Sequence, residues 1–407
     1  MKRNSENCDV LILGGGIVGL TIAYQLLERD ISSKIFLVER ESRLGMHTSG
    51  RNSGVLHAGL YYEPKSLKAK VCVEGARRLK EWMKKKKLKI NYCGKIVIPT
   101  NQILDSQLDK LIKRGRINGA LVEIIDQKEI NKIAPQARSF SGRAIWSPNT
   151  CVVNPIEVLE NLQNDLLEKG VKFFFNKFKW KLDLNEKSIN FFNGPSISYG
   201  HLINATGLQA DLIAHQFGVG MEYKLLPFKG YYWKLKKECP FSLNTNIYPV
   251  PDLNVPFLGI HFTPNYNNSE VYIGPTATPA FGRYNYSFLN GIEPFMALSN
   301  IFTISKQYLF NKGGFRKYGN EQALLALPHL FFKSAQELIP SLEKGFIEPS
   351  NKVGIRSQLF NLKKNALEND FLCTKGPNST HILNAISPAF TSSFALADLI
   401  IDNIEFS

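Results

Sequence analysis

Short apolar runs alternate with a longer amphipathic segment at the start of the chain. Residues 9–13 (DVLIL) form an apolar run of strand length, and residues 34–38 (KIFLV) form a second one. Between them, residues 17–29 (IVGLTIAYQLLER) repeat their apolar positions at helical spacing. This order of strand, helix and strand predicts an α/β fold.

Similar patterns return later in the chain. Asn154 and Pro155 precede a helical pattern that ends at Gly170, which predicts a helix with an Asn cap and proline at its first position. The other elements predicted after Asn154 are strands at 171–175, 201–205, 370–372 and 381–384, and a helix at 394–404.

The composition changes between about residues 216 and 345. Tyr, Phe and Pro become frequent, and alternating patterns at 230–235 (GYYWKL) and 270–274 (EVYIG) predict short strands. We expect an antiparallel sheet here, and residues 91–149 to contribute to it.

The composition and charge limit the class of protein. The chain has 407 residues, of which 44% are hydrophobic, and this is enough for a large core and two domains. A net charge of +15 suits an anionic ligand, an anionic membrane surface or nucleic acid equally well. The six cysteines include no C-x-x-C pair, which argues against a zinc ribbon and a dense disulfide framework. We expect reduced thiols in a cytosolic chain and no metal site.

The N-terminal segment imitates a signal peptide, because Lys2 and Arg3 precede an apolar run from Val10 to Ala23. Four glycines interrupt this run, and no small-residue cleavage site follows it. No other window approaches the ~20 apolar residues of a membrane-spanning helix. About eight residues before the first strand leave little room for a transit peptide. We therefore expect a bacterial-type cytoplasmic location, with peripheral contact at the inner face of the membrane as the alternative.

The glycines between the first strand and the first helix indicate a dinucleotide site. In Gly14-x-Gly16-x-x-Gly19, the first glycine permits a tight turn, the second admits a pyrophosphate, and the third lets helix and strand pack closely. Glu39 lies 20 residues after Gly19, where its carboxylate can accept hydrogen bonds from a ribose. The alternative is a glycine-rich turn without a ligand, and the motif alone does not separate NAD from FAD.

The segment after Glu39 favours FAD. Residues 40–62 have little apolar periodicity and many Gly and Ser residues. Such a stretch is suited to lying along a ligand, and an isoalloxazine ring needs this kind of cover.

This segment also carries a family resemblance. Residues 39–62 (ERESRLGMHTSGRNSGVLHAGLYY) resemble the FAD-binding region of the D-amino-acid-oxidase-like flavoproteins. Within that superfamily, residues 49–76 resemble most closely the L-2-hydroxyglutarate dehydrogenases and oxidases. Further similar segments lie at 227–235, 247–264, 272–283, 354–358 and 384–398.

The resemblance implies FAD as cofactor and a Rossmann-like FAD-binding domain interleaved with an antiparallel-sheet α+β substrate domain. The FAD-binding domain would comprise residues 1–90, 150–215 and 346–407, and the substrate-binding domain 91–149 and 216–345. On the glycine motif and the resemblance together, the cofactor-binding residues predicted are Gly14, Gly16, Ile17, Val18, Gly19, Glu39, Arg40, Thr48, Ser49, Asn52, Ser53, Gly54, Val55, Ala205, Thr206, Gly207, Arg356, Ser387, Pro388, Ala389, Phe390, Thr391 and Ser392.

Oxidation of a 2-hydroxy acid needs a base, a hydride acceptor and partners for the carboxylates. His57 is the first candidate for the base and His261 the second, although an isolated histidine is more often structural. Arg356 can bind a carboxylate bidentately, and Lys229 can hold a second one. The chain departs from the family pattern at Lys229, at Tyr231 and at Ile386, and these departures bear on the substrate more than on the flavin.

The function that the resemblance implies is oxidation of a small anionic hydroxy acid, L-2-hydroxyglutarate, to 2-oxoglutarate. Hydride would pass to flavin N5, and oxygen or a membrane quinone would take the electrons. The alternatives are glycerol-3-phosphate oxidation, amino-acid oxidation, and a flavin-bearing membrane or RNA-binding protein without turnover. His47 and Cys72 lie near the flavin segment in sequence, but no residue dictates covalent attachment of FAD.

The basic run at residues 84–87 has two interpretations. It is either the solvated end of a helix or, with Trp82, a patch that rests on anionic lipid. The sequence contains no recognisable RNA-binding module, so no nucleic-acid partner is expected.

Overall fold

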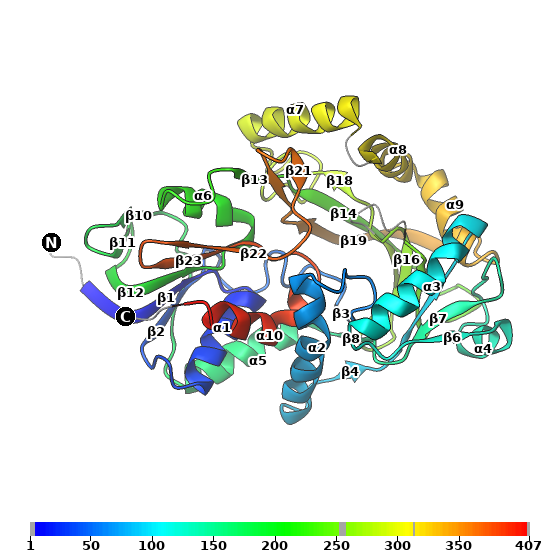
Figure 1. Ribbon diagram of the computed structural model, residues 1–407, viewed down its shortest axis with the longest axis horizontal. Coiled ribbons are helices and arrows are strands. Elements are labelled where there is room, and N and C mark those ends of the chain that lie inside the picture. The colour runs from blue at the N-terminus through cyan, green and yellow to red at the C-terminus, as the bar shows by residue number, and fades with distance from the viewer. Residues whose placement is uncertain (1–4, 252–257, 312–313, 405–407) are drawn as a thin grey trace.

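The computed structural model describes residues 5–251, 258–311 and 314–404. Two large sheets organise the molecule (Figure 1). The first sheet has eight strands, in the order β10-β11-β12-β1-β2-β9, with β23 beside β12 and β22 beside β23. Its strands are β1 (Ser5–Leu13), β2 (Ile35–Val38), β9 (Lys172–Phe174), β10 (Trp180–Asp183), β11 (Ser188–Phe191), β12 (Ser196–Asn204), β22 (Leu372–Gly376) and β23 (Ser379–Asn384).

The centre of the first sheet is parallel and is covered on both faces. β1 pairs in parallel with β12 and with β2, and β12 pairs in parallel with β23. One face packs against a group of helices that share one apolar core, and α6 (Ala210–Gln216) covers the other face (Figure 1). The helices of the first face are α1 (Ile17–Glu28), α2 (Leu67–Lys85), α5 (Pro155–Glu168) and α10 (Ala389–Ile401). The predicted α/β fold class is confirmed.

The second sheet has nine strands and is antiparallel except where β5 runs parallel to β15. Its path is β18-β14-β17-β16-β15-β5-β7-β6, and β19 pairs with β14. Its strands are β5 (Lys95–Ile98), β6 (Glu123–Ile125), β7 (Ala144–Ser147), β14 (Phe228–Leu235), β15 (Asn246–Pro249), β16 (His261–Pro264), β17 (Val271–Gly274), β18 (Thr278–Pro279) and β19 (Ile347–Arg356). Side chains of α4 (Gln127–Ile133) and α9 (Pro328–Leu338) complete one apolar core of this sheet, and α3 (Gln102–Ile117) contributes to another.

Two small sheets connect the parts of the chain. β3 (Val55–Leu56), β8 (Cys151–Val153) and β4 (Ile90–Asn91) form one of them. β13 (Tyr223–Leu225), β20 (Leu359–Asn361) and β21 (Ala366–Leu367) form the other.

Local signals predicted several boundaries correctly. The predicted helix after Asn154 is α5, and the Asn154 side chain accepts a hydrogen bond from Ile156 N at 3.2 Å. Pro155 is its first residue, and Gly170, just past its end, has a φ of +87°. These residues act through their own backbone conformation, so the sequence alone reveals them.

Other boundaries were wrong. Three helices, α7 (Pro294–Phe310), α8 (Phe315–Leu325) and α9, occupy much of the segment expected to hold short strands. α10 begins at Ala389 instead of residue 394, and its first turns bury Thr391, Ser392 and Ser393. Hydroxyl residues usually mark a helix cap, but here they pack between helices: a Cβ on Gly75 of α2 would lie 2.5 Å from the Cα of Ser392.

The proposed division into domains depends on the place of β19. Residues from 346 onward were assigned to the FAD-binding domain, yet β19 pairs with β14 over seven residue pairs, from Phe228–Arg356 to Leu235–Ile347. β19 therefore belongs to the second sheet, and the chain returns to the first sheet at β22.

A buried ion pair joins the two parts of the molecule. Arg283, in the loop between β18 and α7, donates to both carboxylate oxygens of Asp211 on α6, at 2.6 and 2.9 Å. The same guanidinium donates to the carbonyl oxygen of Leu208. Asp211 also accepts from Leu225 N at 3.0 Å, so the pair holds three segments together.

We expect Arg283→Ala to lower the free energy of unfolding by about 3–5 kcal/mol, because Asp211 would remain as a buried charge without its cation. Urea-induced unfolding measures the loss. The control is Arg77→Ala, which removes an exposed pairing with Glu74 and Glu81 and should change little. Equal unfolding midpoints for the two variants would show that the Arg283–Asp211 ion pair does not stabilise the fold.

Candidate active site

Two adjacent cavities lie where β1, β2 and β12 end. The first has a volume of about 420 Å³ and the second about 580 Å³. They share wall residues, so an elongated ligand could extend from one into the other. The shared residues are Gly16, Thr48, Ser49, Ala205 and Gly207.

The glycine turn between β1 and α1 lines both cavities. Gly14 and Gly15 line the first cavity, and Gly16 lines both. Gly14 has a φ of +107°, and a Cβ on it would lie 2.5 Å from the carbonyl oxygen of Ala205. A Cβ on Gly19 would lie 2.1 Å from the carbonyl oxygen of Gly14. Ile17 N, in the first turn of α1, donates to Ser49 Oγ at 3.0 Å. Only residues without side chains allow helix, turn and neighbouring strand to approach so closely.

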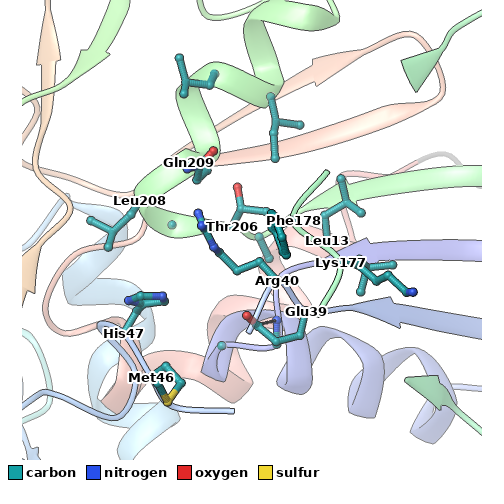
Figure 2. Close-up of a pocket in the computed structure, with 18 of the residues that line it drawn as sticks. Leu13, Glu39, Arg40, Met46, His47, Lys177, Phe178, Thr206, Leu208 and Gln209 are labelled. Atoms are coloured by element: carbon teal, nitrogen blue, oxygen red, sulfur yellow. Dashed lines mark hydrogen bonds between the residues drawn. The ribbon is translucent and has the colours of Figure 1, made fainter. Parts of the chain in front are cut away.

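The first cavity is bounded by the end of β2 and by the turn after β12. Glu39 accepts from Gly15 N at 2.8 Å and from Glu41 N at 3.0 Å, and its carboxylate is thereby held at the cavity wall. Figure 2 shows Arg40 extending from this side toward the turn that carries Thr206 and Gln209. The Arg40 guanidinium stacks on the ring of Tyr284, with 4.2 Å between its central carbon and the ring centroid.

The second cavity is bounded by the loop after Glu39 and by the start of α10. Asn52 stiffens the loop: its amide donates to Ser49 O at 2.7 Å and its oxygen accepts from Gly54 N at 2.8 Å. Gly54 itself faces away from the cavity, and a Cβ there would lie 2.3 Å from Val153 O. The predicted residues that line this cavity are Gly16, Ile17, Val18, Thr48, Ser49, Asn52, Ser53, Val55, His57, Ala205, Gly207, His261, Arg356, Ser387, Pro388, Ala389, Phe390 and Thr391. Ser392 and Gly19 do not line either cavity.

Two histidines face the second cavity. The backbone N of His57 donates to Thr391 Oγ1 at 3.1 Å, while its Nδ1 has no hydrogen-bond partner among the described residues. Burial, and next the charge of Lys95, lower the pKa of His57 to about 3. His261 Nδ1 donates to Gly259 O at 2.9 Å, which leaves Nε2 as the acceptor nitrogen. Burial also lowers the pKa of His261, to about 4, so both imidazoles are neutral at pH 7.

Cationic side chains line the same cavity. Burial lowers the pKa of Arg356 to about 10, so the guanidinium stays charged at pH 7. Lys68, in the first turn of α2, is only 7% exposed. Burial, and then the nearby Arg356, lower the pKa of Lys68 to about 7. Arg114 also reaches the wall, but it is engaged by Tyr61 O at 2.9 Å and by Glu63.

Lys68 was not predicted, although the sequence contains a signal for it. It lies four residues before the buried Cys72, on the apolar face of α2. A lysine in that stripe has to reach a cavity or a partner, because burying an unpaired ammonium group is costly. A second buried lysine, Lys95 of β5, was also not predicted. Its Nζ lies 4.6 Å from the ring centroid of Tyr61 and 5.1 Å from that of Tyr248, and both rings line the cavity.

The structure places Lys229 away from the second cavity. Phe228, Gly230 and Tyr232 of β14 line the second cavity, so the alternation of a strand turns Lys229 to the other face. There its Nζ donates to Asn285 Oδ1 and to Ser287 O, both at 3.0 Å. The ammonium group is thus already satisfied away from the cavity.

Trp82 does not belong to an exposed patch with the basic run at residues 84–87. Trp82 is 5% exposed, and its Nε1 donates to Asp165 Oδ2 at 3.1 Å, so it cannot enter a lipid surface. Lys86 pairs with the same carboxylate. Cys72 is a fully buried thiol whose pKa is raised by burial to about 12, which makes it unreactive.

A side-chain-free turn at a helix N-terminus, an acid at the end of the second strand and two communicating cavities are the features of a dinucleotide-binding oxidoreductase. The chain matches the family described as FAD dependent oxidoreductase (DAO) over residues 9–403, and it belongs to that family. The cofactor is therefore FAD, and the residues around the two cavities fit it. The resemblance found in the sequence is confirmed.

The chain is similar to curated proteins over nearly its whole length. It is 36% identical to "L-2-hydroxyglutarate dehydrogenase, mitochondrial" of Caenorhabditis briggsae, with 96% of this chain and 92% of the relative covered. It is 32% identical to the human protein of the same description, with 99% and 90% covered. For "L-2-hydroxyglutarate dehydrogenase" of Indibacter alkaliphilus, the identity is 33%, with 95% and 96% covered.

Solved structures share the fold at lower identity. The FAD-bound L-alpha-glycerophosphate oxidase of Mycoplasma pneumoniae has a TM-score of 0.73 at 20% identity, with 97% of this chain and 94% of that chain covered. Glycine oxidase of Geobacillus kaustophilus has a TM-score of 0.69 at 16% identity, with 98% and 94% covered.

We expect Gly16→Ala to lower the affinity for FAD by at least about tenfold, because a methyl group would take the space that the pyrophosphate approaches. Gly16 has an ordinary φ of −78°, and the nearest atom to its Cβ, Ser49 Oγ at 2.9 Å, can rotate, so the protein should fold. The ratio of flavin to protein absorbance measures the loss. Gly345→Ala, where a Cβ meets nothing within 4 Å, is the control. Full flavin content in Gly16→Ala would contradict this role.

Proposed function

We propose that the protein oxidises L-2-hydroxyglutarate to 2-oxoglutarate with FAD. The observation that carries this proposal is a single cavity in which Arg356 and Lys68 lie with two neutral imidazoles, beside the glycine turn. Two cations suit a dianionic substrate, and a neutral imidazole suits removal of a hydroxyl proton. The descriptions of the three curated relatives name the same substrate.

His57 is our candidate for the base. It accepts the proton of the substrate hydroxyl, and its position against Thr391 at the start of α10 holds the ring at the cavity wall. FAD, when bound, supplies the hydride acceptor. His261 is the second candidate, and its stacking on Tyr248, with 3.8 Å between ring centroids, fixes its orientation.

We assign the two carboxylates of the substrate to Arg356 and Lys68. The guanidinium offers a bidentate fork for one carboxylate, and the ammonium group offers a point charge for the other. Lys68 thus takes the role expected of Lys229. A bound dianion would also favour the charged form of Lys68, whose pKa is lowered to about 7 without it.

For the cofactor, we propose that the first cavity holds the adenosine part and the second the flavin. Glu39 would accept from the ribose, Gly14 to Val18 would face the pyrophosphate, and the start of α10 would stabilise negative charge on the reduced ring. We propose the first sheet as the FAD-binding domain and the second as the substrate domain.

We propose oxygen or a membrane quinone as the electron acceptor and a cytoplasmic location with peripheral membrane contact. All six cysteines are free thiols, in line with a reducing compartment. No helix in the described part of the chain is long and apolar enough to cross a membrane.

We expect anaerobic addition of L-2-hydroxyglutarate, but not its D isomer, to bleach the flavin band near ~450 nm. His57→Gln should slow bleaching by about 10²–10⁴-fold. Because the pKa of His57 is about 3, the base is neutral down to pH 5, and the wild-type rate at saturating substrate should show no acid limb between pH 8 and pH 5. A loss of rate toward alkaline pH would come from Lys68, whose pKa is lowered to about 7. An ordinary histidine would show an acid limb near 6.5.

Three outcomes of that experiment would contradict the proposal. Bleaching by glycerol 3-phosphate or by an amino acid instead would change the substrate and keep the fold. Bleaching by neither isomer would remove the substrate assignment. A rate that falls to half as the pH is lowered through about 6.5 would exclude His57 in its buried state as the base.

We expect Lys68→Met to raise the KM for L-2-hydroxyglutarate by about 10–100-fold with a smaller change in kcat, because it removes a charge-assisted hydrogen bond to the substrate. Lys70→Met, at an exposed position of the same helix, is the control. Lys229→Met should leave KM within a few-fold once flavin content shows that the variant folds. A larger rise for Lys229→Met than for Lys68→Met would restore the original assignment.

A further inference from the structure

The fully buried residues of helix α7 are polar, and most of its large apolar residues are exposed. Of its apolar residues, Met296 and Ile304 pack partly buried against the protein. The residues that it buries are Asn300, Thr303 and Gln307. Gln307 Nε2 donates to Asn365 Oδ1 at 2.8 Å, and Thr303 Oγ1 accepts from Lys224 Nζ at 2.5 Å. A surface helix of a soluble protein normally turns its apolar stripe inward, whereas α7 leaves most of its large apolar side chains exposed.

The outward face of α7 carries large apolar side chains. Phe295 is 90% exposed and Phe302 72%, and Leu298 and Leu309 fall on the same helical stripe. Phe288 and Leu289, in the loop before α7, are 85% and 69% exposed. Figure 1 shows α7 along the outer edge of the molecule, at the top of the view, with α8 following it. Exposed apolar side chains gathered in this way mark an interaction surface.

Cations surround the C-terminal half of this stripe. Lys306 lies on α7 itself, and residues 294–310 contain no Asp or Glu. Lys363 and Lys364 are exposed in the turn after β20, next to the Asn365 that Gln307 contacts. Arg316 of α8 donates to Leu309 O at 3.0 Å, which places a further guanidinium at the helix end.

The combination of apolar and basic side chains favours a lipid surface over a second copy of the chain. A twofold contact centred on the C-terminal half of α7 would bring Lys306 and its neighbours against the same cations of the partner, and like charges repel. An anionic bilayer accepts the apolar side chains among its acyl chains and the cations among its headgroups. At 17 residues, α7 is about 25 Å long, which suits a helix lying in the plane of the interface.

We propose that the outward face of α7, with Phe288 and Leu289, docks the protein on an anionic phospholipid bilayer. This surface is distinct from the basic run at residues 84–87. The next helix, α8, reaches the second cavity, because Gln322 lines that cavity and accepts from Ala277 N at 2.9 Å. The proposal does not depend on the substrate or on the catalytic roles assigned above.

Sedimentation of the FAD-loaded protein with vesicles tests the proposal. One set of vesicles contains phosphatidylcholine alone, and the other contains phosphatidylcholine with phosphatidylglycerol. The test variants are Phe295→Ser with Phe302→Ser, and Lys306→Glu with Lys364→Glu. The matched control is Ile103→Ser with Phe140→Ser, which removes apolar side chains that are 76% and 59% exposed elsewhere.

The wild type should bind the anionic vesicles more tightly than the neutral ones, and added salt should weaken the binding. The phenylalanine variant should lose at least about tenfold in vesicle affinity, because each ring leaves the acyl region. The lysine variant should lose the preference for phosphatidylglycerol, and the control should bind as the wild type does. These results together would support the proposal.

Unchanged binding by the phenylalanine variant, or no binding by the wild type, would overturn the proposal. Light scattering that shows a dimer which Phe295→Ser with Phe302→Ser dissolves, without vesicle binding, would assign the face to a second copy. Flavin bleaching by L-2-hydroxyglutarate is measured on every variant and should not change. Absence of bleaching in the wild type, with vesicle binding retained, would refute the proposed function alone.

Discussion

The close approach of the Gly14 turn to the backbone of Ala205 is the constraint on which the rest of the structure depends. It brings β1, α1 and β12 together with no side chain between them, and Ala205 N donates to Leu13 O at 2.8 Å to fix the register. Both cavities meet at this contact. A larger residue at Gly14 would push the strands apart and separate the wall after β12 from the helix N-terminus that an anionic cofactor requires.

The second cavity combines two neutral imidazoles with a charged guanidinium and a lysine that titrates near neutral pH. Burial keeps His57 and His261 uncharged, while Arg356 remains charged and Lys68 is held near its titration point. The buried ammonium group of Lys95 also lowers the pKa of both imidazoles, because its positive charge disfavours a proton on either ring. This set of charges therefore favours an anion in the cavity and keeps both imidazoles neutral, and both effects weaken if water enters the cavity.

Helices α7 and α10 show why some elements escaped prediction from the sequence. Both bury polar residues: Thr391 and Ser392 pack between helices in α10, and Thr303 and Gln307 face the protein in α7. Periodicity analysis assumes that apolar residues point inward, and this assumption fails when a helix packs through small hydroxyl groups or when its apolar face is turned to another medium. A lysine at position 229 suggested a partner for a substrate carboxylate. The side chain lies on the face of β14 that is turned away from the second cavity, where it binds Asn285 and Ser287.

The sequence by itself determined the α/β class, the glycine turn, the Asn154 cap and the family, because each depends on a few neighbouring residues whose backbone needs are specific. It also identified His57, His261 and Arg356, which the fold brings into one cavity from three distant segments. Only the tertiary structure decided that Lys68 lies in that cavity and Lys229 does not, that β19 belongs to the second sheet, and that α7 turns its apolar face outward. The physical reason is that burial and the choice of face are set by packing between segments distant in sequence, which local patterns do not encode.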